Sequence, residues 1–156
     1  MPRQLWLLRH GEAQPHHAGP DADRRLTPEG EGQSRSAGAA LARLNLGLAA
    51  CYASPRVRAL ETARLACASL GVDPVVHEPL SGGFDSGGAR ELVLGEDDDA
   101  RVLIVGHEPD LSGIVEALTG ARIAMKKGGV AAVRLDGSRE ELLAVLRPRD
   151  LRAIEA

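Results

Sequence analysis

Arginine and histidine side chains follow three of the predicted strands in this 156-residue chain. Arg9 and His10 come directly after an apolar run near the N-terminus. Arg56 and Arg58 follow a second apolar run, and His107 follows a third. The carboxyl ends of parallel strands meet at one edge of an open α/β sheet, where ligands bind. We therefore expect these side chains to share one pocket.

A pocket that contains several arginines suits a phosphoryl group. The planar guanidinium fork matches phosphate oxygens, and helix N-termini at the same sheet edge add backbone donors. A histidine among arginines loses affinity for its proton, so it stays neutral and can act as a nucleophile. The helix dipole disfavours cations at a helix N-terminus, so Arg56 and Arg58 at such a position indicate an anionic partner.

Each of these side chains also has a simpler interpretation. Arg56 and Arg58 can be solvated charges on the first turn of a helix. His107 can be a hydrogen-bonded histidine that closes a strand. The remaining histidines lack the strand-end context and are predicted to be loop or edge residues: His16, His17 and His77.

A zinc site is an alternative for the two strand-end histidines. His10 and His107 could bind zinc together with Glu12 or Glu108. The arginines around both histidines disfavour a cation, so we expect no metal and no other cofactor.

Composition limits the class of protein. The net charge of -3 argues against a general nucleic-acid or membrane-surface binder, so positive charge should be confined to a local pocket. The 2 cysteines are too few for a disulfide framework. No apolar stretch is long enough to cross a bilayer, and the N-terminus lacks the layout of a signal peptide. We expect a cytoplasmic protein with a single domain over residues 1–156.

The hydrophobic pattern predicts the elements that position the pocket. Strand–helix alternation as far as residue 120 indicates a three-layer α/β/α sandwich with a mostly parallel sheet. Two closely spaced strands near the end indicate a C-terminal antiparallel hairpin. We expect Thr27 and Ser54 each to cap a helix, because a proline follows each of them. The predicted strands are residues 5–9, 48–53, 74–77, 102–105, 130–135 and 142–146. The predicted helices are residues 28 to near 47, 55–70, 89–94 and 109–118. The predicted loops include residues 14–25 and 79–88 and a turn at Asp136-Gly137.

Four short motifs occur in order along the chain. They are Leu7-Leu8-Arg9-His10-Gly11-Glu12-Ala13, Leu26-Thr27-Pro28-Glu29-Gly30, Ser54-Pro55-x-x-Arg58-Ala59-x-x-Thr62-Ala63 and Val105-Gly106-His107. This set resembles the histidine phosphatase superfamily, the family of the cofactor-dependent phosphoglycerate mutases and acid phosphatases. The short length and two further segments are most similar to the small SixA-type phosphohistidine phosphatases: Gly106-His107-Glu108-Pro109-Asp110-Leu111 and Met125-Lys126-Lys127-Gly128.

The resemblance implies a phosphoglycerate mutase-like fold and a role for each matching residue. His10 would be the nucleophile that becomes phosphorylated. Arg9 and Arg58 would bind the phosphoryl oxygens, and His107 would donate to the phosphoryl group as it transfers. Arg56 falls on a variable position of its motif and would lie at the rim of the pocket.

The four motifs do not identify a general acid that would protonate the leaving group. Larger members of the superfamily carry a long insertion that forms a lid and usually supplies a carboxylic acid to protonate the leaving group. Here the corresponding span, residues 72–101, is short and rich in glycine. Its carboxyl groups on Glu78 and Asp85 lie outside the motifs and are predicted to belong to ordinary loop residues. Glu12 and Thr27 lie in motifs and are expected to have supporting roles.

The resemblance implies a metal-independent phosphatase that forms a phosphohistidine on His10. Its substrate and partner would be a protein that carries phosphohistidine. A phosphate ester releases an alkoxide, which needs a dedicated acid, whereas a phosphohistidine releases imidazole, which does not. One alternative is a broader phosphatase of small phosphate esters or nucleotides. Another is a binding module that recognises phosphorylated proteins without turnover. His10 and His107 argue against the binding module, because a pure binder needs no nucleophile.

Overall fold

The structure, a computed structural model, describes residues 2–136 and 140–156. Within these residues the centre of the fold is a 6-stranded sheet with the strand order β3-β2-β4-β1-β5-β6. The first four strands in this order are parallel, whereas β5 runs antiparallel to both of its neighbours. The strands are β1 (Arg3–Arg9), β2 (Ala50–Ala53), β3 (Pro74–Val76), β4 (Arg101–Gly106), β5 (Val130–Leu135) and β6 (Glu140–Leu146).

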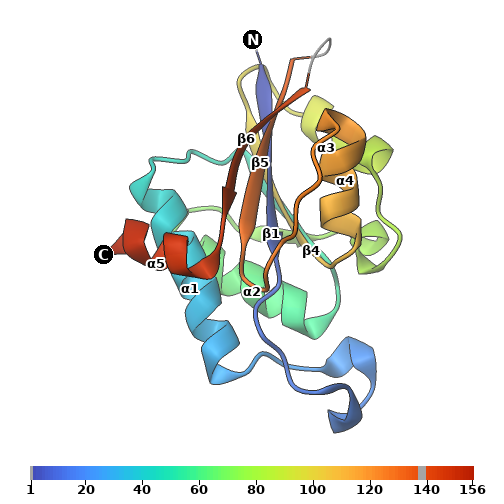
Figure 1. The fold of residues 1–156 in the computed structure, drawn as a ribbon, viewed down its shortest axis with the longest axis vertical. Coiled ribbons are helices and arrows are strands. Elements are labelled where there is room, and N and C mark those ends of the chain that lie inside the picture. Colours follow the sequence, from blue (N-terminus) through green and yellow to red (C-terminus); the bar gives the residue numbers. More distant parts are fainter. Residues whose placement is uncertain (1, 137–139) are drawn as a thin grey trace.

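Helices cover both faces of this sheet (Figure 1). One face carries α1 (Pro28–Arg43), α2 (Val57–Cys67) and α5 (Pro148–Glu155), and the other carries α3 (Ser86–Leu94) and α4 (Asp110–Thr119). Successive β1 side chains point to opposite faces. Trp6 and Leu8 therefore pack with the first set of helices, and Leu5 and Leu7 pack with the second. The predicted three-layer α/β/α fold and the antiparallel pairing of β5 with β6 are confirmed.

The two predicted helix caps have different outcomes. Thr27 caps α1, because its Oγ1 accepts a hydrogen bond from the Gly30 amide at 3.1 Å. The prediction that Ser54 caps the second helix is wrong, because α2 begins at Val57 with Arg56 in the cap position. The Ser54 hydroxyl instead contacts His107, and this tertiary partner accounts for the difference.

Two further segments differ from the sequence prediction. The predicted loop over residues 79–88 contains a 3-10 helix (Glu78–Ser81) and the first turn of α3. Asp85 caps α3, accepting from the Gly88 amide at 3.0 Å. A C-terminal helix, α5, was not predicted, because Leu151 is its one fully buried side chain and the rest of its sequence is largely polar. The Gly137 half of the predicted turn lies outside the described residues.

No helix among the described residues combines the length and the apolar character needed to span a membrane.

Helix α1 approaches the segment after β1 closely enough that two glycines are required. A Cβ on Gly30 would lie 1.9 Å from the carbonyl oxygen of Glu12, and one on Gly11 would lie 2.5 Å from that of Gly30. The Thr27 amide also donates to the Glu12 carbonyl at 3.0 Å. The first two motifs therefore form one tightly packed unit beneath His10.

Gly30→Ala should lower the free energy of unfolding by roughly 2–3 kcal/mol, because the added methyl group meets backbone that cannot move aside. Urea denaturation would measure this loss. Gly32→Ala is the matched control on the same helix, where an added Cβ has nothing within 4 Å. This control should be stabilising by roughly 0.5–1 kcal/mol. Equal losses in the two variants would contradict the close-packing argument.

Candidate active site

The carboxyl ends of β1 and β4 and the start of α2 enclose a polar pocket. Its volume is about 400 Å³. Four of the five predicted site residues line it, and Arg56 does not. The lining residues are Arg9, His10, Ala13, His16, Asp21, Arg24, Arg58, His107, Glu108 and Lys127.

His10 is held as a neutral imidazole whose Nε2 carries no proton. Its Nδ1 lies 2.7 Å from the Gly11 carbonyl oxygen. A carbonyl can only accept, so Nδ1 carries the proton and Nε2 keeps its lone pair. Burial, followed by the charges of Arg58 and Arg9, lowers the pKa of His10 to about 4. A neutral ring with an unprotonated Nε2 is the form that a nucleophile requires.

His107 lies beside His10, with 5.2 Å between the ring centroids. Its Nε2 is 2.8 Å from the Ser54 hydroxyl, which accepts from the Arg56 amide at 3.2 Å. Ser54 still has its own proton to donate to Nε2, and in that arrangement the ring proton of His107 is on Nδ1. That Nδ1 is buried and has no hydrogen-bond partner among the described residues. Burial is the main cause that lowers the pKa of His107 to about 3, so it too is neutral.

Arg58 and Arg9 approach the pocket from two different elements. Arg58 is buried on the first turn of α2, and its Nε donates to His10 Nε2 at 3.4 Å. Its Nη1 and Nη2 donate to the backbone carbonyl and the carboxylate of Asp21 at 2.8 and 3.2 Å. Arg9 ends β1 and donates from Nη1 to the Met125 carbonyl at 2.9 Å, while its buried Nε has no partner in the described part of the chain. Burial lowers the pKa of both guanidinium groups, but arginine remains protonated in proteins. Two fixed cations therefore line the same pocket as His10.

Thr62 connects these groups to one another. Its Oγ1 accepts from the Gly11 amide at 3.1 Å and donates to the Arg58 carbonyl at 2.8 Å. The first turn of α2 is thereby fixed to the residue that follows His10. The motif Ser54-Pro55-x-x-Arg58-Ala59-x-x-Thr62-Ala63 contains this threonine, so the sequence did carry a signal for it.

Arg56 lies next to the pocket but is not among the residues that line it. Its Nε donates to the Ser81 carbonyl at 2.7 Å, and its Nη1 pairs with Asp21. The side chain is 31% exposed, compared with 8% for Arg58. The predicted difference between the two arginines therefore has a structural counterpart.

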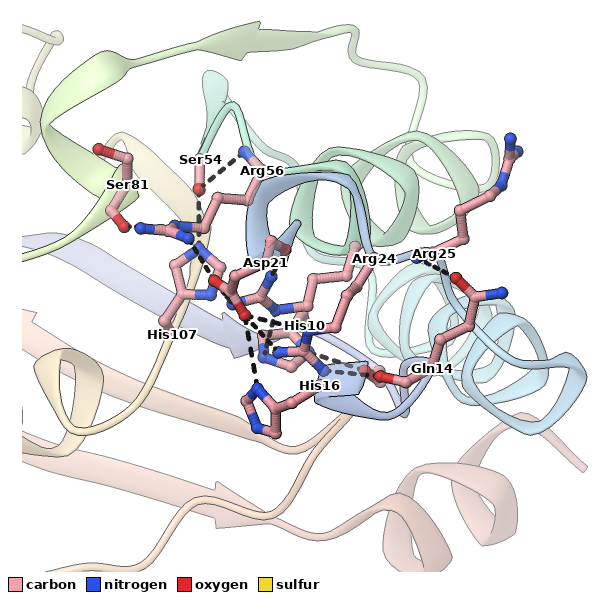
Figure 2. Close-up of polar contacts among 12 residues, drawn as sticks. His10, Gln14, His16, Asp21, Arg24, Arg25, Ser54, Arg56, Ser81 and His107 are labelled. Carbon is pink, nitrogen blue, oxygen red and sulfur yellow. Dashed lines mark hydrogen bonds and ion pairs between the residues drawn. The ribbon is translucent and has the colours of Figure 1, made fainter. Parts of the chain in front are cut away.

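Asp21 is a site residue that the sequence analysis missed. It lies on the 3-10 helix Asp21–Asp23, and its carboxylate is surrounded by cations (Figure 2). Oδ1 accepts from Arg24 at 2.8 and 3.0 Å, and Oδ2 pairs with Arg56 and, at 3.2 Å, with Arg58. The hydrogen bond from Arg24 is the main cause that lowers the pKa of Asp21 to about 2. An internal anion therefore neutralises the arginines in part.

Asp21→Asn should strengthen binding of inorganic phosphate by roughly 5- to 10-fold, because a fixed negative charge beside the arginines repels a phosphate oxygen. The inhibition constant of inorganic phosphate would measure this. Asp23→Asn is the matched control, since this exposed side chain on the same turn does not line the pocket. Weaker phosphate binding in the Asp21 variant would mean that its main effect is to position the arginines.

The histidine pair should stay neutral well below the ordinary histidine pKa of about 6.5. Nitrogen NMR of the imidazoles should find His10 protonated on Nδ1 alone until the pH approaches 4, where its pKa lies. The unfolded chain binds more protons than the folded chain between these two values. The free energy of unfolding should therefore fall as the pH drops through this window. Titration of His10 near pH 6.5 would contradict the burial argument.

The zinc alternative lacks a ligand set in the structure. Among residues 2–136 and 140–156, no group of three or more His, Cys, Asp or Glu side chains is arranged to hold a metal ion. Glu108 instead accepts from the Ser112 amide at 2.8 Å, at the start of α4.

The carboxyl groups in the pocket are not those that the sequence analysis considered. Glu78 and Asp85 are absent from the pocket lining, which agrees with their prediction as ordinary residues. Asp21 and Glu108 line it instead. With a pKa of about 2, Asp21 is ionised at neutral pH and holds no proton to donate. Glu108 is the other carboxyl group that lines the pocket.

Comparison with known proteins gives consistent results. The sequence profile of the histidine phosphatase superfamily (branch 1) matches residues 5–82. An uncharacterised protein of Picosynechococcus sp. (strain ATCC 27264 / PCC 7002 / PR-6) is 33% identical over 147 residues, covering 87% of each chain. The protein histidine phosphatase SixA complexed with tungstate matches with a TM-score of 0.84 and 26% identity over 95% of this chain and 99% of that one. A protein from Nakamurella multipartitia, provisionally assigned as a phosphohistidine phosphatase SixA, matches with a TM-score of 0.81 and 24% identity over 95% and 97%.

This chain belongs to the histidine phosphatase superfamily, as its motifs predict. Within the superfamily it is similar to the SixA proteins and falls among the phosphatase hydrolases. The predicted class of enzyme is therefore confirmed.

Proposed function

We propose that this protein is a phosphohistidine phosphatase that acts on phosphorylated proteins through a covalent intermediate on His10. The observation that carries the proposal is an unprotonated His10 Nε2 that accepts a hydrogen bond from Arg58 Nε at 3.4 Å. A phosphate-binding site needs the arginine, but only a covalent route needs the unprotonated nitrogen beside it. The two cysteines, Cys51 and Cys67, are free and buried, which supports action in the reducing cytoplasm.

In the first step, His10 Nε2 attacks the phosphorus in line with the leaving group. A new N–P bond forms as the P–N bond of the substrate breaks, and the substrate imidazole, whose other nitrogen already carries a proton, departs as a neutral ring. Arg9 and Arg58 bind the equatorial phosphoryl oxygens, and the unpaired Nδ1–H of His107 donates to a third. These groups supply the positioning and charge stabilisation on which phosphoryl transfer depends.

In the second step, a water oxygen attacks the phosphorus on His10. An O–P bond forms as the N–P bond to Nε2 breaks, and both protons of the water leave with the inorganic phosphate, so that His10 is neutral again. The same arginines and His107 bind the oxygens again, so one set of donors serves both steps. Positively charged and donor side chains perform the charge neutralisation that a divalent metal ion supplies elsewhere. We infer that the reaction is independent of metal. The tungstate complex of the SixA relative supports a pocket that accepts tetrahedral oxyanions.

The choice of phosphohistidine rests on the leaving group. An alkoxide needs a proton in the transition state, whereas imidazole is far less basic and can be protonated before it leaves. Asp21 is ionised and cannot serve as the acid. The pocket of about 400 Å³ is open to the surface and can admit a histidine displayed on a folded protein.

A broader phosphatase of small esters is the second candidate, and Glu108 is the observation that favours it. Its carboxyl group lines the pocket beside His107 and could protonate an alkoxide. The two candidates therefore make opposite predictions for Glu108→Gln.

A turnover panel tests the proposal. It compares a phosphohistidine protein with a sugar phosphate, a nucleotide and phosphotyrosine, each with and without a chelator. We expect the highest kcat/KM on phosphohistidine, no effect of the chelator, and no effect of Glu108→Gln on that substrate. Glu78→Gln and Asp85→Asn are matched controls outside the pocket. Efficient hydrolysis of an alkyl phosphate that is lost in Glu108→Gln would establish the second candidate.

A further inference from the structure

A second, larger groove of about 560 Å³ lies beside the catalytic pocket. Apart from Gln33 and Pro148, every residue that lines it is a lysine or an arginine. These cations are Arg9, Lys126, Lys127, Arg147, Arg149 and Arg152. We call this surface the basic groove. The whole chain has a net charge of -3, so the basic groove is a local reversal of sign.

Most of these cations have no carboxylate within ion-pair distance among the described residues, although the more distant charges of Asp150 and Glu29 act on Arg149 and Arg152. Arg147 pairs with Asp150 at 3.2 Å. Lys126, Lys127, Arg149 and Arg152 are exposed, and none forms an ion pair within the part of the chain that the structure describes. Like charges held together without counter-ions repel one another, and an external anion relieves that repulsion.

The fold holds the basic groove in a fixed shape. One side is the segment before β5, where Gly128 donates to the backbone carbonyls of Arg9 and His10. The other side is α5, which packs on α1 (Figure 1) through the fully buried Leu151. The cations therefore stand on two anchored segments.

The basic groove and the catalytic pocket share two lining residues. Arg9 and Lys127 line both. A molecule that presents a phosphoryl group to His10 must therefore lay its neighbouring surface on or beside the basic groove. This continuity distinguishes the groove from scattered surface charge.

We propose that the basic groove docks an acidic surface of the protein that carries the phosphohistidine. This inference rests on the proposed function and adds to it the charge of the partner. The groove is open and longer than the reacting group needs, so it fits a partner surface better than an enclosed small ligand. Complementary charge of this kind accelerates encounter and fixes the register of binding.

The test measures binding and turnover with one probe. The probe is a strongly acidic histidine phosphotransfer domain, phosphorylated on its histidine with phosphoramidate. The variant is the double charge reversal Arg149→Glu, Arg152→Glu, neither of which lines the catalytic pocket. The matched control is Arg64→Glu, Arg122→Glu, which changes the net charge equally at exposed positions outside both surfaces.

Turnover should separate the two substrate sizes. We expect kcat/KM on the acidic domain to fall by roughly 10-fold or more in the groove variant, mainly through KM, and to lose its dependence on salt. Turnover of free phosphohistidine should be unchanged, as should both activities of the control. Equal losses on the domain and on free phosphohistidine would overturn docking, because the charges would then act on the catalytic pocket.

Binding keeps the inference separate from the proposed function. The same groove reversal is placed in a His10→Ala background, and affinity for the domain is measured by titration. Unchanged affinity overturns docking whatever the turnover data show. Groove-dependent affinity with no turnover by the wild type would support docking and overturn the phosphatase proposal. Tighter groove-dependent binding of a short single-stranded DNA than of the domain would overturn the acidic protein as the occupant.

Discussion

His10→Ala should abolish turnover on every substrate while the protein stays folded. We expect kcat to fall by at least about 10⁴-fold, because removal of a nucleophile eliminates the covalent route entirely. The ring is buried, but its short hydrogen bond is to the carbonyl of the neighbouring Gly11, and Arg58, its partner at 3.4 Å, is also held by Asp21, so little tertiary structure depends on the ring. Steady-state kinetics and a thermal unfolding scan would measure the two effects side by side.

Trapping of the intermediate gives the second readout for His10. Wild-type enzyme mixed with labelled substrate should yield a phosphoenzyme that is labile in acid and stable in alkali, as expected for a phosphoramidate. His10→Ala should yield none. His17→Ala is the matched control, because this exposed histidine does not line the pocket. Wild-type rates in His10→Ala would refute the nucleophile assignment.

The meeting of His10, Arg58 and His107 could be predicted because local pattern and sheet topology determine it together. Apolar runs identify the strands, and parallel strands bring their carboxyl ends to one edge. The polar residues after each run can then be placed at that edge from the sequence alone. The alternation of Leu5 and Leu7 with Trp6 and Leu8 likewise requires helices on both faces. These features depend on periodicity, which a single sequence displays.

Asp21 could not be predicted because its position depends on contacts that leave no periodic pattern. Its loop is closed by an isolated bridge between Ala13 and Leu26 and by the Gln14 amide, which donates to the Arg25 carbonyl at 2.9 Å. Only this closure brings the carboxylate among arginines from other elements. The sequence shows that the loop contains charged residues, but it does not show which way their side chains point.

The hydrogen bond of Ser54 to His107 and the helix α5 could not be predicted, for related reasons. A serine before a proline is typical of a helix cap. Only the three-dimensional arrangement shows that the Ser54 hydroxyl forms a hydrogen bond with His107, which is distant in sequence. Helix α5 is short and mostly polar, so its stability comes from packing on α1 rather than from its own propensity. The basic groove could not be predicted for the same reason, because the arginines of α5 approach Lys126 and Lys127 only when α5 packs on α1.

Arg58→Ala should cost roughly 2–4 kcal/mol of transition-state stabilisation, by analogy with the loss of one donor at an oxyanion site. Its Nε lies 3.4 Å from His10 Nε2, so it can contact the phosphoryl oxygens at the moment of transfer. The loss should appear in kcat as well as in KM, and it corresponds to roughly 30- to 1000-fold in kcat/KM. Arg58→Lys should recover only part of it, because an ammonium group lacks the planar fork.

Arg56→Ala is the matched comparison, since it removes a guanidinium group from the same helix start. This side chain pairs with Asp21 and Ser81 and does not line the pocket, so we expect a loss of only a few-fold. Loss of its charge also leaves Asp21 with Arg24 and Arg58, which keeps the carboxylate ionised. Equal losses in the two variants would mean that the phosphoryl group binds across both arginines, and the site would then have to include Arg56.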